Sequence, residues 1–232
     1  MKNIGEGGGE RPPPLTGLDA VFARQLYANS HVPRTGFAIT AYTLEVLFSS
    51  ENPKELISEF LSTSLSEERF RALKERADRL HAVYLPKDEI PEITKERMEE
   101  YWQTDQLATQ EFMRMLCGEP HDRNDDTPRT FETDTDRVLE LLQTRTLPLE
   151  EVRDALSAVV AAFKEPEMKQ ILKEYKDFFK EEYWKKGLRR RQDEMQARQQ
   201  ELKNQTFSRA REHLELPTET ARKVFEFLQS IN

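Results

Sequence analysis

Two aromatic pairs are the residues best suited to hold a small apolar molecule. Tyr101 is followed by Trp102, and Tyr183 is followed by Trp184. Each pair lies in a stretch with helical periodicity. Tyr and Trp combine a large apolar surface with one polar group, and such residues commonly line small-molecule pockets. The pairs therefore predict a ligand-binding pocket formed by these four residues, and the competing interpretation is that they are ordinary core residues.

A run of cations follows the second pair and is the strongest candidate for contact with a polyanion or an acidic partner. It consists of Lys185, Lys186, Arg189, Arg190 and Arg191. At about 100° per helical residue, these side chains cover two adjacent faces, which suits a phosphate backbone or an acidic protein surface. Residues 167–211 hold 13 Lys and Arg against 8 Asp and Glu, whereas the whole chain has a net charge of −8. Because the acidic remainder would repel a polyanion, we expect weak or no nucleic-acid binding. A solvated helix face is the alternative.

Two further groups could bind a metal ion, but their spacing argues against it. Asp125, Asp126, Asp134 and Asp136 crowd one polar stretch without the glycine and closing glutamate of an EF-hand. Cys117 and His121 lie four residues apart, yet no second pair completes a zinc site. We expect no metal and no cofactor.

Familiar catalytic and phosphate-binding motifs are absent from the sequence. It contains no Gly-x-Ser-x-Gly, no His-Glu-x-x-His and no phosphate loop after the early glycines. A single cysteine suits a reducing compartment, and no apolar run is long enough to span a membrane. The N-terminus lacks the apolar core of a signal peptide. These features predict a cytoplasmic protein that does not enter a membrane.

Helical periodicity extends over most of the chain and predicts an all-α, irregular bundle of about nine helices. Candidate end signals are the capping box Ser64-x-x-Glu67, Gly118 as a helix stop, Pro166 at a first helical position and Thr218 as a cap. The predicted helices lie near 17–28, 35–49, 53–61, 67–84, 94–117, 135–143, 149–163, 166–213 and 218–228.

The segment 166–213 reads as one long helix around whose first half the other helices pack. Its densest apolar stripe predicts that Ile171, Tyr175 and Phe178 are buried. Beyond Trp184 only one position per heptad is apolar, which is too few for a coiled coil. We therefore expect the half at 185–213 to project or to lie on another surface. Homodimerisation through this helix is one expectation.

The division of the chain follows from composition. Residues 1–14 are rich in glycine and proline and predict a disordered leader. Residues 15–232 predict a single helical domain, interrupted by a mobile acidic loop at 118–134.

Several short segments give the chain a resemblance to the helical effector-binding region of some bacterial ArsR-type transcriptional regulators. They are Tyr42–Leu47 followed by Glu51–Pro53, Val83–Pro86, Leu147–Val152, and Tyr175–Phe179 leading to Trp184. Such regulators normally also carry a winged helix-turn-helix, and no pattern of that kind follows residue 214. The resemblance therefore implies a stand-alone helical module that binds a ligand or a partner.

Three functions are compatible with these patterns. We expect a non-catalytic ligand-binding or protein-interaction module with a regulatory role. Its expected partner is a protein, a second copy of the chain or a small apolar ligand. The first alternative is a transcription-related regulator that contacts nucleic acid or an acidic partner through the basic helix. The second is a small helical enzyme whose site the sequence does not reveal.

Overall fold

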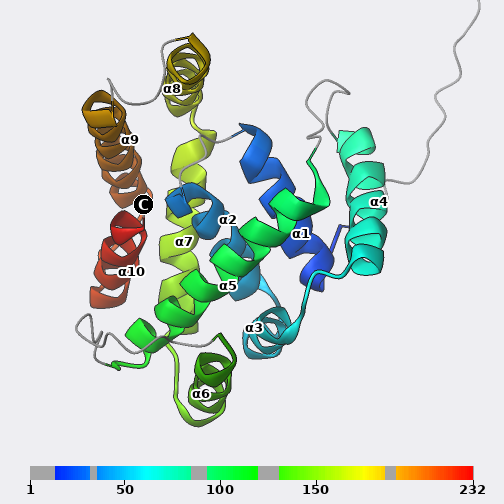
Figure 1. Cartoon of the computed structure of the whole chain (residues 1–232). Coiled ribbons are helices and arrows are strands. Elements are labelled where there is room, and N and C mark those ends of the chain that lie inside the picture. Colours follow the sequence, from blue (N-terminus) through cyan, green and yellow to red (C-terminus); the bar gives the residue numbers. More distant parts are fainter. Residues whose placement is uncertain (1–13, 32–35, 85–92, 120–130, 186–191, 232) are drawn as a thin grey trace, which may run out of the picture.

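The computed structural model describes residues 14–31, 36–84, 93–119, 131–185 and 192–231 (Figure 1). These residues form ten α-helices and no strand. The all-α fold that the periodicity predicts is confirmed. None of the described helices is both long and apolar enough to cross a bilayer. The helices are α1 (Gly17–His31), α2 (Gly36–Ser49), α3 (Pro53–Ser62), α4 (Glu67–Tyr84), α5 (Lys95–Leu116), α6 (Phe131–Thr144), α7 (Leu149–Lys164), α8 (Pro166–Lys185), α9 (Gln192–Glu212) and α10 (Glu219–Ser230).

The centre of the molecule is α2, with α1 packed on one side and α7 on the other (Figure 1). Glu45 is its only charged residue, and α2 can therefore be covered by neighbours on nearly all sides. The Tyr42 ring stacks on that of Phe163 in α7, with centroids 5.9 Å apart. The prediction that the chain is organised around the first half of 166–213 is wrong, because α8 carries charges all round and has only a narrow apolar stripe to bury.

The predicted single helix over 166–213 is also wrong. Arg198 in α9 places its guanidinium carbon 4.0 Å from the centroid of the Phe178 ring in α8. In one straight helix, twenty residues would separate these side chains by about 30 Å. Helices α8 and α9 are therefore two separate helices in contact with each other, and residues 186–191 between them lie outside the described part.

Helix α9 packs into the core and does not project, in contrast to the expectation for 185–213. Leu202, Phe207 and Ala210 are buried, and the Phe207 ring lies 5.5 Å from that of Phe225 in α10. Thr206 shares this buried face because its hydroxyl donates to the Leu202 carbonyl oxygen at 2.8 Å. The count of apolar residues per heptad underestimates how much of α9 is buried, because it leaves out Thr206. The hydrogen bond of this hydroxyl is satisfied within the helix.

The apolar stripe of α8 is buried only in part. Tyr175 is buried, whereas Ile171 and Phe178 are half-buried. The prediction of burial is therefore wrong for the latter two residues. Their stripe faces the edge of the bundle, where the described part of α8 packs mainly against α7 and α9.

The predicted helix ends are mostly confirmed. Thr94 and Thr218 accept hydrogen bonds from the backbone N–H groups of Arg97 and Ala221, respectively. Gly118 follows α5 with a φ of 73°, a left-handed conformation that glycine adopts without strain. The capping box is placed two residues early, since Ser66 and not Ser64 accepts from the N–H of Arg69.

Candidate functional site

One hollow on the described part of the molecule lies between the start of α1, the end of α2 and α3. It encloses about 640 Å³. We call it the α1–α3 groove. Nine of its fourteen described lining residues are polar or charged, while apolar atoms supply about half of its surface. The lining comprises Leu15, Thr16, Gly17, Ala20, Arg24, Glu45, Val46, Ser49, Ser50, Glu51, Asn52, Glu55, Leu56 and Glu59.

Short-range sequence signals explain how the groove walls are formed. Pro53 occupies the first turn of α3, so the chain leaves α2, turns through Ser50–Asn52 and immediately enters the next helix. Leu56 faces inward from α3 and is buried, while Glu55 beside it remains exposed. The amphipathic pattern of this short helix therefore directs its glutamates to the groove and its apolar residues to the core.

The groove is acidic. Four glutamates and one arginine line it, which amounts to a formal charge of −3 at pH 7. Arg24 lies 3.9 Å from Glu45 across the α1–α2 contact. At the outer rim, Glu59 lies 3.7 Å from Arg69, and both side chains are exposed. No described ion pair reaches Glu51 or Glu55.

A buried carboxylate in α5 connects α1 and α2, two of the helices that line the groove. Asp105 in α5 is 1% exposed. One of its oxygens accepts from Thr40 Oγ1 at 2.8 Å, and the other accepts from Thr43 Oγ1 at 2.6 Å and from Gln25 Nε2 at 2.8 Å. Since Gln25 belongs to α1 and both threonines to α2, the carboxylate joins three helices.

The pKa of Asp105 reflects this environment. Burial raises it to about 6, and the hydrogen bonds from Thr43, Thr40 and Gln25 oppose the rise. All three donors are neutral, so they offset only part of the cost of removing a carboxylate from water. The arrangement suits a structural connector, because Asp105 is not among the residues that line the groove.

The first aromatic pair lies at the core, not at a pocket. Trp102 is buried, its indole ring lies 4.9 Å from that of Phe60, and its Nε1 donates to the Thr63 carbonyl oxygen at 3.1 Å. Tyr101 is half-buried against the same core. The side chains of Tyr183 and Trp184 lie outside the described residues. The predicted four-residue ligand pocket therefore stays a prediction, and neither Tyr101 nor Trp102 lines any of the three hollows described.

The basic cluster also lies beyond what the structure describes. Lys185 is the last residue of α8, but its side chain is not described, and Lys186, Arg189, Arg190 and Arg191 fall in the undescribed segment. Its role as a polyanion or partner site stays a prediction.

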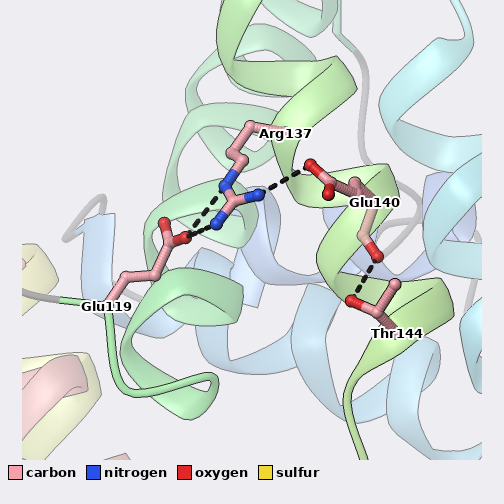
Figure 2. Close-up of polar contacts among 4 residues, drawn as sticks. All are labelled: Glu119, Arg137, Glu140 and Thr144. Carbon is pink, nitrogen blue, oxygen red and sulfur yellow. Dashed lines mark hydrogen bonds and ion pairs between the residues drawn. The ribbon is translucent and has the colours of Figure 1, made fainter.

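The ends of the expected acidic loop are fixed by an ion-pair cluster (Figure 2). Arg137 in α6 donates from Nε and Nη2 to Glu119 Oε1, at 2.9 and 2.7 Å, and from Nη1 to Glu140 at 2.6 Å. Helix α6 begins at Phe131, so the last four residues of the expected loop are helical. Residues 120–130, with His121, Asp125 and Asp126, lie outside the described part. Where the structure is described, no group of three His, Cys, Asp or Glu residues is arranged to hold a metal ion.

Cys117 gives little support to the idea of a nucleophile. It is half-buried at the end of α5. Burial raises the pKa of its thiol, and the negative charge of the nearby Glu119 raises this pKa further. A raised pKa keeps the sulfur protonated and unreactive at neutral pH.

Two features that sequence reasoning missed have recognisable signals. Glu51, Glu55 and Glu59 recur every four residues, the spacing of one helix face. In α5, Asp105 falls on the inward stripe at alternating spacings of four and three residues, with Met98, Trp102, Thr109 and Phe112. A carboxylate on such a stripe indicates a buried polar network.

Comparison with known proteins identifies no relative: no protein-family model, no curated protein and no solved structure matches this chain.

Proposed function

We propose that the protein is a non-catalytic protein-interaction module whose partner binds in the α1–α3 groove. The observation that supports this proposal is the groove itself, a hollow of about 640 Å³ whose described lining combines five charged residues with the apolar residues Leu15, Ala20, Val46 and Leu56. Protein interfaces typically combine an apolar centre with a polar rim. The proposal agrees with the stand-alone binding module that the ArsR-type resemblance implies, and the single cysteine favours action in the cytoplasm.

A small apolar ligand suits the groove less well than a protein. Pockets for small molecules are lined mainly by apolar and aromatic side chains. The groove contains no aromatic residue, and most of its lining is charged or hydroxyl-bearing. Nucleic acid suits it least, since four glutamates repel phosphate. Contact with nucleic acid through the basic cluster stays a separate prediction.

Site-specific photocrosslinking tests the proposal. A photoreactive amino acid replaces Ser49, an exposed residue that lines the groove, in cells that naturally contain the protein. The same replacement at Gln143, exposed on α6, serves as the control. We expect a discrete set of protein adducts from position 49, none of them from position 143. These adducts should disappear in a Glu51→Lys/Glu55→Lys variant that retains its helical circular dichroism. Equal labelling from both positions, or none from position 49, would contradict the proposal.

A further inference from the structure

We infer that the occupant of the α1–α3 groove is a basic, amphipathic segment of the partner protein. The Lys or Arg side chains of this segment contact the glutamates of the groove, and one of its apolar side chains packs on the apolar residues of the groove. This inference rests on the proposed function and specifies the chemistry of the partner.

The first argument is the unbalanced charge of the groove. Arg24 is the only cation in the lining, and it already pairs with Glu45. Lys54 adjoins the groove in sequence but reaches away from it, because its Nζ donates to the Arg145 carbonyl oxygen at 3.0 Å. Glu51 and Glu55 therefore have no cation among the described residues, and an external Lys or Arg would complement them.

The second argument is the spacing of the acidic residues on α3. Glu55 and Glu59 are four residues apart, so they lie on one face of the helix. Like charges at this spacing destabilise a helix. A lysine in place of either glutamate would form a stabilising pair with the other one. Helix stability therefore does not explain why both residues of this face are acidic. Cations spaced along a partner segment would relieve the repulsion.

The third argument is the position of the groove at the end of α2. The carbonyl end of a helix carries partial negative charge, which at α2 is offset only in part by Arg153 of α7, whose Nε donates to the Phe48 carbonyl oxygen at 3.2 Å. Leu15, Ala20, Val46 and Leu56 provide an apolar surface next to this end. The methylene stem of a Lys or Arg can lie along such a surface while its charged group reaches the rim.

A metal ion would neutralise the negative charge of the groove less well than a cationic peptide would. Calcium needs several oxygen ligands converging within about 2.6 Å. Where the chain is described, no three carboxylates converge in this way. The glutamates of the groove are spread over α2, the turn after it and α3, which matches separate cationic groups along a chain.

Selection from a phage-displayed library of short random peptides tests the inference on the full-length protein. We expect enrichment of peptides with two or more Lys or Arg residues around an apolar residue. The most enriched peptide, labelled with fluorescein, is then titrated in an anisotropy assay at low and high salt. Its Kd should rise with salt, and should be roughly tenfold higher for Glu51→Gln/Glu55→Gln at low salt.

The matched control is Glu68→Gln/Glu150→Gln, which makes the same charge change at exposed residues in the first turns of α4 and α7. It should bind the peptide like the wild type. Enrichment of neutral or acidic peptides, or equal affinity of both double variants, would overturn the inference. If Ser49 still forms specific adducts in that case, the proposed function stands with another type of partner. Salt-sensitive dimerisation, weakened by Glu51→Gln/Glu55→Gln, would instead identify a second copy of the chain as the occupant and would also overturn the inference.

Discussion

At the scale of single residues, Asp105 makes the stability of the protein depend on pH. Its pKa in the folded state is about 6, against a usual value near 3.8. The folded protein therefore binds a proton more tightly than the unfolded chain does. The resulting stabilisation is fully present below the unfolded pKa and is lost as the pH rises through about 6. By linkage, the loss over this window is about 3 kcal/mol.

We predict that Asp105→Asn removes this part of the pH dependence. Asparagine is neutral and of similar shape. Rotation of the Gln25 amide, whose Oε1 has no hydrogen-bond partner among the described residues, would turn that acceptor in place of Nε2 toward the new amide donor. Urea unfolding at several pH values between about 4 and 7 should show the variant gaining stability relative to the wild type as the pH rises. A constant difference between the two proteins across this range would show that Asp105 does not titrate with a raised pKa.

Trp102 supports a second prediction at this scale. The Thr63 carbonyl oxygen accepts from both Trp102 Nε1 and Gln106 Nε2, at 3.1 and 2.9 Å. Trp102→Phe removes the first donor without leaving the carbonyl unpaired, so the hydrogen-bond loss alone should cost about 1 kcal/mol. Gln106→Leu/Trp102→Phe removes both donors and should cost more than the sum of the single variants, as measured by chemical unfolding. Additive losses would contradict a shared acceptor.

At the scale of elements, the packing of α9 against the bundle distinguishes this fold from one with a long projecting helix. Phe207 is fully buried between Phe37 of α2 and Phe225 of α10, with ring centroids 6.1 and 5.5 Å away. Lys203 reinforces the contact, because its Nζ donates to the carbonyl oxygens of Gln229 and Ile231 at the end of α10. These contacts make α9 a part of the core.

We predict that Phe207→Ala costs about 3–5 kcal/mol of unfolding free energy, as expected when a large aromatic residue is removed from a core. Phe178→Ala in α8 should cost distinctly less, because this side chain is half-buried and packs against Arg198 at the edge of the bundle. Denaturant unfolding of both variants gives the comparison. A larger loss for Phe178→Ala would support the long-helix arrangement and contradict the packing of α9.

At the scale of the whole molecule, one contiguous apolar core joins the described helices. It extends from Leu18 in α1 to Leu228 in α10, and α2 contacts five other helices, α1, α3, α5, α7 and α10. No described group of helices has a separate core of its own. The helices are therefore expected to lose their packing together.

We predict a single cooperative thermal transition. In differential scanning calorimetry, the calorimetric and van't Hoff enthalpies should agree, as they do for two-state proteins. Tryptophan fluorescence and far-ultraviolet circular dichroism should report the same midpoint, since Trp102 lies at the contact of α5 with α3 inside this core. Two resolved transitions would show that part of the bundle unfolds independently.

Local patterns in the sequence were enough to predict most of the helices and their ends, but not the division of 166–213 into α8 and α9. Thr94, Pro166, Gly118 and Thr218 act through backbone groups within a few residues of themselves, so their effects can be read without knowing the fold. Apolar periodicity in turn predicts the all-α class, because a helix with one apolar face must bury it against other helices.

Only the tertiary structure decided which helix lies at the centre, that α9 packs into the core, and which charges share a groove. Asp105 can be buried because Gln25, Thr40 and Thr43 surround it. The partners of Asp105 are 62 to 80 residues away in the chain. The periodicity of one helix contains no information about such partners, so it cannot distinguish a buried polar residue from an exposed one. The acidic α1–α3 groove depends on the same kind of long-range proximity, between the start of α1 and α3.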